Sequence, residues 1–149
     1  MVPRARRPID KRLIYVAQTV SNTQDSTQLL APTFPCTVMG IRWAVSAIGG
    51  AATSTVLSYA IVVSRDGDSP NTLGSSDAGD FYTPEQDVLA FGTMLMADSD
   101  LSVNLAQNDK GETKSMRKLR VGDTVHMIAK CADAVSVTFK GVVQLFCKT

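Results

Sequence analysis

The chain has 149 residues, 44% of them hydrophobic and 19% charged, and a formal net charge of +1. This length and composition suit one compact domain with its own core. The three cysteines are an odd number and form no C-x-x-C pair, which argues against the disulfide framework of a small secreted domain and favours a reducing compartment.

Positive charge is concentrated at the start of the chain, in the stretch VPRARRPIDKR. Its basic residues are Arg4, Arg6, Arg7, Lys11 and Arg12. The sequence therefore predicts a flexible basic arm over residues 1–12 and a folded domain over residues 13–149. Basic side chains in such an arm attract phosphates without fixed base contacts, so we expect these five residues to bind nucleic acid independently of its sequence. A short basic run can also act as a solubilising tail or a nuclear import signal.

Hydrophobicity repeats every two residues along most of the chain, and no stretch of a dozen residues has a helical stripe. In residues 36–47, for example, Ile41, Trp43 and Val45 alternate with small or polar residues. Eight strands are predicted. In chain order they cover residues 12–20, 26–34, 36–47, 56–65, 87–96, 115–120, 124–130 and 134–147.

Residues 43–64 form an uncharged run that is long enough to cross a bilayer. Gly49, Gly50 and many Ser and Thr residues interrupt it, so we expect two strands joined by a turn and no membrane contact. No apolar signal-peptide core follows the basic start, so secretion is not expected.

The predicted strands are joined by loops of unequal length, the longest over residues 66–86 and rich in Gly, Ser, Asp and Pro. Eight alternating strands and a few long loops predict an all-β fold, a single jelly-roll antiparallel sandwich. An immunoglobulin-like sandwich is the alternative, although paired sheet cysteines are absent.

The sequence offers little catalytic chemistry. His126 is the single histidine, and no Ser-His-Asp arrangement, G-x-S-x-G elbow or phosphate loop can be assembled around it. Asp66 and Asp68 do not have EF-hand spacing, and the carboxylates of Glu85 and Asp87 lack a sugar-binding aromatic cluster. We therefore expect no enzyme, no metal site and no cofactor.

A second basic cluster consists of Lys114, Arg117, Lys118 and Arg120. In an extended strand Lys118 and Arg120 face one way and Arg117 the other, so a single flat phosphate patch is not implied. The cluster is predicted either to contact acidic loops of neighbouring copies or to bind nucleic acid.

Five segments carry a resemblance to a known family. They are TFPCTVMGIRW (residues 33–43), YAIVVSRDG (59–67), TPEQDVLAFG (83–92), KSMRKLRVGD (114–123) and GVVQLFCKT (141–149). Together they resemble capsid proteins of circular Rep-encoding single-stranded DNA viruses, including the circoviruses. The resemblance implies a jelly roll of which sixty copies form a small icosahedral (T=1) shell around a circular single-stranded DNA genome, with the basic arm directed inward. It also implies a location in the virion, after assembly in the host nucleus or cytoplasm, and it identifies no host receptor.

The arm is shorter than in circoviruses, and simple counting shows the consequence. Sixty copies with five arm charges supply about 60 × 5 = 300 positive charges, whereas 149 codons alone span 149 × 3 = 447 nucleotides. The arm alone cannot neutralise such a genome, so other cations are needed. The alternative function is a soluble β-sandwich binding module, a lectin-like or cytokine-like oligomer that binds a ligand through the 66–86 loop.

Overall fold

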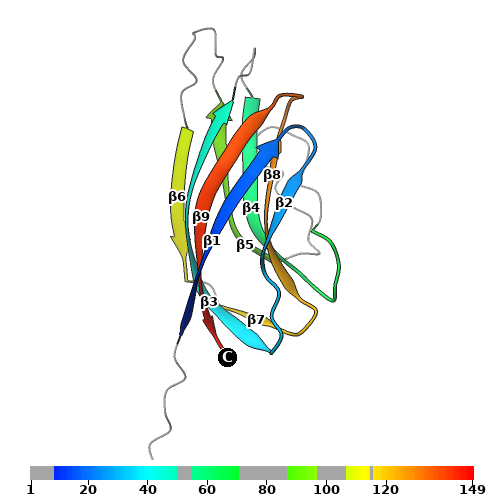
Figure 1. The fold of residues 1–149 in the computed structure, drawn as a ribbon, viewed down its shortest axis with the longest axis vertical. Coiled ribbons are helices and arrows are strands. Elements are labelled where there is room, and N and C mark those ends of the chain that lie inside the picture. Colours follow the sequence, from blue (N-terminus) through cyan, green and yellow to red (C-terminus); the bar gives the residue numbers. More distant parts are fainter. Residues whose placement is uncertain (1–8, 50–54, 71–86, 97–106, 115) are drawn as a thin grey trace, which may run out of the picture.

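The computed structural model describes residues 9–49, 55–70, 87–96, 107–114 and 116–149, and every regular element within these ranges is a β-strand (Figure 1). The strands are β1 (Asp10–Val20), β2 (Asp25–Leu30), β3 (Cys36–Gly49), β4 (Thr55–Ser64), β5 (Asp87–Met96), β6 (Gln107–Thr113), β7 (Arg117–Leu119), β8 (Thr124–Cys131) and β9 (Val137–Lys148). The uncharged run over residues 43–64 contributes to β3 and β4, and the described residues contain no helix long and apolar enough to span a membrane.

The strands form two antiparallel sheets that face each other. One sheet has the order β1-β9-β3-β6, with the short β7 paired to the first residues of β3. The other has the order β2-β8-β4-β5. This strand order is that of a jelly roll, in which two Greek keys fold into a double-layered sandwich. The predicted fold class is therefore confirmed.

The first strand begins earlier than the sequence predicted. Asp10 and Lys11 were predicted to lie in a flexible arm, and Arg12 where the arm meets the first strand. All three lie in β1, where they pair with residues 145–147 of β9. The long final strand β9 provides backbone partners for these residues, and this pairing overrides their polar character. Residues 1–8 lie outside the described ranges.

Strand β6 was not predicted at all. Its sequence QNDKGET lacks an apolar residue at every second position, which is the signal by which the other strands were found. Its side chains nevertheless alternate between half-buried and exposed, and it pairs with residues 41–47 of β3. It is the edge strand of its sheet. A strand with one neighbour buries less surface, so it can form from polar residues.

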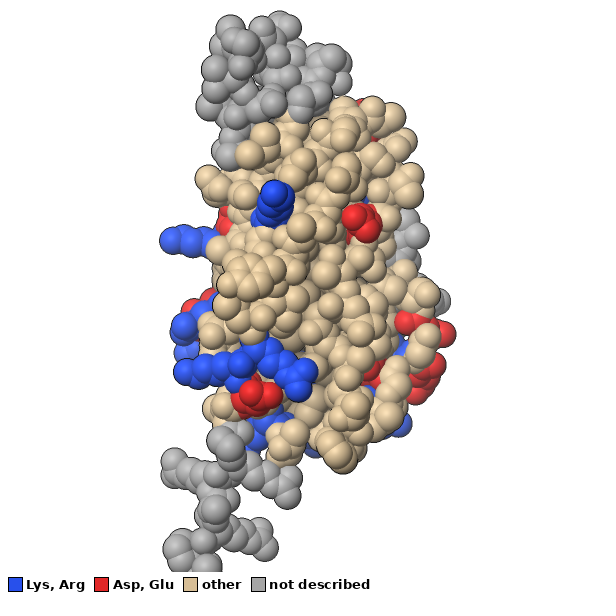
Figure 2. Space-filling view, in the orientation of Figure 1, with Lys and Arg blue, Asp and Glu red and all other residues tan. Residues whose placement is uncertain are grey.

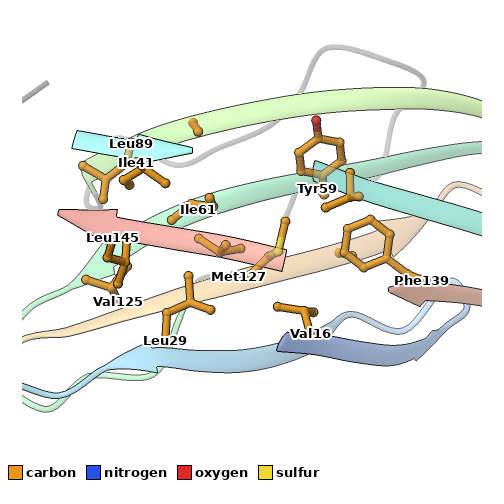
Figure 3. Packing of buried hydrophobic residues seen from close by; sticks show 14 of the residues in the cluster. Val16, Leu29, Ile41, Tyr59, Ile61, Leu89, Val125, Met127, Phe139 and Leu145 are labelled. Carbon is orange, nitrogen blue, oxygen red and sulfur yellow. The ribbon is translucent and has the colours of Figure 1, made fainter. Parts of the chain in front are cut away.

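The core lies between the two sheets and is built from their inward-facing side chains (Figure 3). Ile41, Phe139 and Leu145 come from the β1-β9-β3-β6 sheet. Tyr59 and Met127 come from the opposite sheet, and the Tyr59 and Phe139 rings lie with their centroids 5.7 Å apart. Removal of this apolar surface from water is the main force holding the layers together.

A chain of polar contacts joins the sheets within this core. The Trp43 Nε1–H group donates to Tyr59 Oη at 3.0 Å, and the Tyr59 hydroxyl donates to the Asp109 carboxylate. Burial, together with the hydrogen bond to Asp109, raises the pKa of Tyr59, which keeps the phenol protonated as a donor. Gly92 and Gly111 leave room for the two rings, since a Cβ would lie 2.4 Å from Tyr59 Oη or 2.2 Å from Trp43 Cζ2. The contact fixes β6 to its neighbour β3 and to β4 of the opposite sheet.

We predict that Tyr59→Phe lowers the free energy of unfolding by about 1–3 kcal/mol, because it leaves the Trp43 N–H and the Asp109 carboxylate without their shared partner. Equilibrium urea unfolding of the unassembled subunit measures the change. Tyr15→Phe is the matched control, since the Tyr15 side chain is 74% exposed and should shift stability by less than about 0.5 kcal/mol. Equal stability of the two variants would contradict a structural role for the contact.

Candidate nucleic-acid interface

The outward side of the β1-β9-β3-β6 sheet is arranged in rows of side chains from neighbouring strands. The central row contains Tyr15, Val142, Ala44 and Lys110, one from each strand. The next row contains Ala17, Lys140, Ser46 and Asn108. Successive residues of a strand face opposite sides of the sheet. The residues in these rows therefore point away from the core, and their neighbours along each strand point into it.

Positive side chains gather on this outward side. Seven exposed residues form what we name the cationic face. They are Lys11, Arg42, Lys110, Lys114, Lys118, Lys140 and Lys148. Glu112 is the one acidic residue at an outward position of the strands described in this sheet, which leaves a formal charge of 7 − 1 = +6. Figure 2 looks onto this sheet and shows Lys and Arg over its β6 side and lower half.

The structure describes two of the five predicted arm residues, Lys11 and Arg12. Arg4, Arg6 and Arg7 lie outside the described residues. Lys11 lies on the cationic face, opposite Phe146 of β9. The Arg12 Nε lies 3.3 Å from Asp10 Oδ2, and both side chains are more than half exposed, so this ion pair is weak.

The second predicted cluster divides between two surfaces. Lys118 pairs with Thr37, which pairs on its other side with Lys148, so this part of β7 extends the cationic face. Arg117 is half-buried and donates through Nη1 to the Met116 carbonyl at 3.0 Å. Arg120 follows β7 and is exposed in the turn to β8. The predicted alternation of Arg117 and Lys118 therefore matches their burial.

Sequence reasoning did not assign Arg42, Lys110, Lys140 or Lys148 to a site. The signal was present, because Arg42 and Lys140 occupy the polar positions of alternating strands. What was missing was the strand order, which brings four strands from distant parts of the chain side by side. Lys110 lies on β6, the strand that was not predicted.

Arg42 is held close to the sheet surface. Its Nε lies 3.3 Å from Glu112 Oε2, and its guanidinium carbon lies 5.5 Å from the centre of the Phe146 ring. Both contacts are exposed and each contributes little to stability. They hold the guanidinium of Arg42, the one arginine of the cationic face, next to Glu112 and the Phe146 ring on the outward side of the sheet.

A hollow of about 980 Å³ lies on the same side, beside the central rows. Its lining includes Tyr15, Ala44, Val142, Lys110 and Lys140. The small side chains leave the floor low, and the Tyr15 ring and the two lysines stand at its border.

The opposite sheet differs in charge. On its outward strand positions, Lys130 is the one cation within the described residues. Ala60, Val62 and Ile128 form a separate buried cluster there, and Phe91 and Leu95 on β5 are 59% and 63% exposed. Among the residues that the structure describes, the sandwich thus has one strongly positive and one largely uncharged side.

A buried carboxylate fixes the turns at the end of the sandwich where the basic residues lie. Asp123 is 1% exposed and accepts hydrogen bonds from the Arg65 Nη1 group at 2.8 Å and the Arg120 backbone N–H at 2.8 Å. Arg65 Nη1 also donates to the Lys118 carbonyl, and Gly67 N–H donates to the Gly122 carbonyl at 2.8 Å. These contacts hold the turn after β4 against the turn between β7 and β8.

The three cysteines and His126 are buried or half-buried and lie outside the cationic face. Burial raises the pKa of Cys131 and Cys147 to about 11, and it also raises the pKa of the half-buried Cys36; all three thiols are free. His126 lies with Nε2 2.8 Å from Thr124 Oγ1, and burial lowers its pKa. No group of three or more potential metal ligands occurs among the residues that the structure describes.

The pKa of Asp123 leads to a prediction on acid stability. Burial raises this pKa, but the hydrogen bonds from Arg120, Arg65 and Asp66 outweigh burial and hold it below its ordinary value. The contribution to stability is therefore present at neutral pH and is lost as the pH falls below about 4 and through the folded pKa. Asp123→Asn should lower the unfolding free energy by about 2 kcal/mol at pH 7 and by clearly less at pH 3.

Urea unfolding at the two pH values measures this difference. The control is Asp66→Asn, because Asp66 is exposed and asparagine tolerates its positive φ of 55°. A loss for Asp123→Asn that is the same at both pH values would refute the pH dependence.

Comparisons with known proteins add little to this geometry. No family model matches the chain, and no curated protein matches it. Among solved structures, one described as "Bacillus endospore appendages form a novel family of disulfide-linked pili" aligns with a TM-score of 0.40 and 11% identity, over 100% of this chain and 96% of the other. At that TM-score the two chains need not share a strand topology.

Proposed function

We propose that this protein is a viral capsid protein whose copies assemble into a small icosahedral shell, with sixty subunits, around a circular single-stranded DNA genome. The observation that carries the proposal is the charge asymmetry of the sandwich. One outward side has a formal charge of +6, and the other has one cation at its described strand positions. This sidedness suits a wall between a nucleic acid and solvent, because the positive side would attract phosphates.

The cationic face also addresses the shortage of charge in the arm. Beyond the five arm residues, of which Lys11 is one, the face adds six cations per copy. Sixty copies would then supply about 60 × 11 = 660 positive charges, compared with about 300 from the arms alone. This total exceeds the 447 nucleotides of the coat gene. The cationic face by itself, with Lys11 included, supplies about 60 × 7 = 420 charges, so we propose that both the arm and the face bind the genome.

Subunit contacts are proposed at the end of the sandwich where β3 begins and β7 and β8 meet. Phe34, Met116 and Val121 lie in the turns at this end and are 72%, 62% and 61% exposed. Arg117 and Arg120 lie in the same turns or beside them. Exposed aromatic, Met and Arg side chains next to one another are typical of protein interfaces.

Negative-stain electron microscopy and size-exclusion chromatography of the purified full-length protein test the proposal. Sixty copies of 16.0 kDa predict particles of about 60 × 16.0 = 960 kDa before any nucleic acid. Closed particles of uniform diameter are the expected result. A monomer or trimer that binds a glycan would contradict it and favour the soluble binding module.

Charge reversal tests the proposed contact. Arg117→Glu with Lys118→Glu should abolish particles. Arg117 is proposed to face acidic loops of a neighbour, and Lys118 follows it on β7, where the cationic face meets this end of the sandwich, so the reversed charges would become repulsive there. Far-UV circular dichroism should stay unchanged, since both residues lie on a short strand at the margin of the fold. The control is the charge-conserving pair Arg117→Lys with Lys118→Arg, which should assemble. Intact particles from the charge-reversed variant would refute the contact.

A further inference from the structure

Tyr15 has no role in the core that explains its presence. Its side chain is 74% exposed, and it is the most exposed of the large hydrophobic residues in the described ranges. It stands in the middle of β1, on the outward side, between the rows of small residues and lysines. An aromatic ring at such a position gives up contact with water only when a ligand covers it.

The surroundings of Tyr15 have space for a flat group. Across the sheet from it lie Val142 and then Ala44, whose short side chains form the floor of the 980 Å³ hollow. Lys110 ends the same row, and Lys140 stands in the next row. Adjacent rows are about 7 Å apart, because two residues separate them along each strand. A ring, a low floor and two cations thus lie within the reach of one nucleotide and its neighbours.

We propose that this side of the β1-β9-β3-β6 sheet binds single-stranded nucleic acid, with a base stacked on the Tyr15 ring and the flanking phosphates at Lys110 and Lys140. The proposal rests on the proposed function, because it names the surface that would hold the genome inside the shell. Exposed aromatic rings on an open sheet, bordered by cations, are a common means of binding unpaired bases.

Charge and chemistry favour this occupant over others. The formal charge of +6 on the cationic face calls for a polyanion. In a duplex the bases are already stacked on one another, so a duplex would contact the lysines and leave the ring unused. A run of Asp and Glu residues would likewise match the charge but would have no aromatic ring to stack on Tyr15.

Fluorescence anisotropy with full-length unassembled protein and a labelled oligothymidylate, free or annealed to oligoadenylate, tests the site. Tyr15→Ala should weaken single-strand binding by about 5- to 150-fold and leave duplex binding unchanged, since each stacked base contributes that much. Tyr15→Phe should bind as the wild type does, because it keeps the ring. Phe91→Ala is the control, since it removes a 59% exposed aromatic side chain from the other sheet.

Salt dependence separates the stacking of the base from the binding of the phosphates. Lys110→Gln with Lys140→Gln should reduce the slope of log affinity against log salt by about 1.4, or about 0.7 for each phosphate that is no longer neutralised, whereas Tyr15→Ala should leave the slope unchanged. Circular dichroism verifies the fold of each variant. Unchanged single-strand binding in Tyr15→Ala, an equal reduction for single strand and duplex, or no binding by the wild type would overturn the proposal.

Particles distinguish this inference from the proposed function. Tyr15→Ala should still form particles under the microscope but with less nuclease-protected nucleic acid per particle. Particles with a full nucleic-acid content would overturn the stacking site and leave the shell intact as a proposal. Failure of the wild type to form particles would contradict the shell, and the anisotropy results would still decide whether the site exists.

Discussion

The strand register of the β1-β9-β3-β6 sheet is the constraint on which the rest of the structure depends. In β3, Ile41 and Val45 face the core while Arg42 and Ala44 face outward, so one register sets both surfaces. A shift by one residue would place cations in the core and apolar residues on the surface. Several features oppose such a shift, among them the bulge between Val38 and Gly40 and the fit of Gly111 against the Trp43 ring.

The polar contact between Trp43, Tyr59 and Asp109 extends this register to the second sheet. Its members come from β3, β4 and β6, and the phenol satisfies a donor and an acceptor at once. Buried polar groups are costly unless they are paired in this way, so the contact admits one alignment of the layers and disfavours others. This contact holds the edge strand β6 in place. It thereby also positions Lys110, which lies on β6 and belongs to the cationic face.

The fold class followed from the sequence because its signal is local. Alternation every two residues marks β3, β4, β5 and β9, and their bounds lie within a few residues of the predicted ranges. Strand β6 was missed because its identity as a strand comes from its partner β3 rather than from its own residues. The start of β1 was placed too late for a similar reason, since Asp10–Arg12 is ordered by β9.

The candidate site was harder to predict, because it joins residues that are far apart in the chain. Basic clusters along the sequence indicated Lys11 and Lys118, which both lie on the cationic face. Lys140 and Arg42 are isolated in the sequence, and only the strand order brings them to the same surface. Tyr15 looks like an ordinary strand residue until its exposure is known. Charge counting along a chain therefore finds clusters, whereas a surface that crosses four strands requires the topology.

The three cysteines are free thiols, and their burial determines how easily they are oxidised. Burial raises the pKa of Cys131 and Cys147 to about 11, so both thiols stay protonated at neutral pH, and the thiolate is the form that oxidants attack. The third thiol, Cys36, is half-buried, so it lies closer to solvent than the other two. In the proposed shell, Cys131 and Cys147 would therefore resist aerobic oxidation, and any cross-link between copies would have to use Cys36.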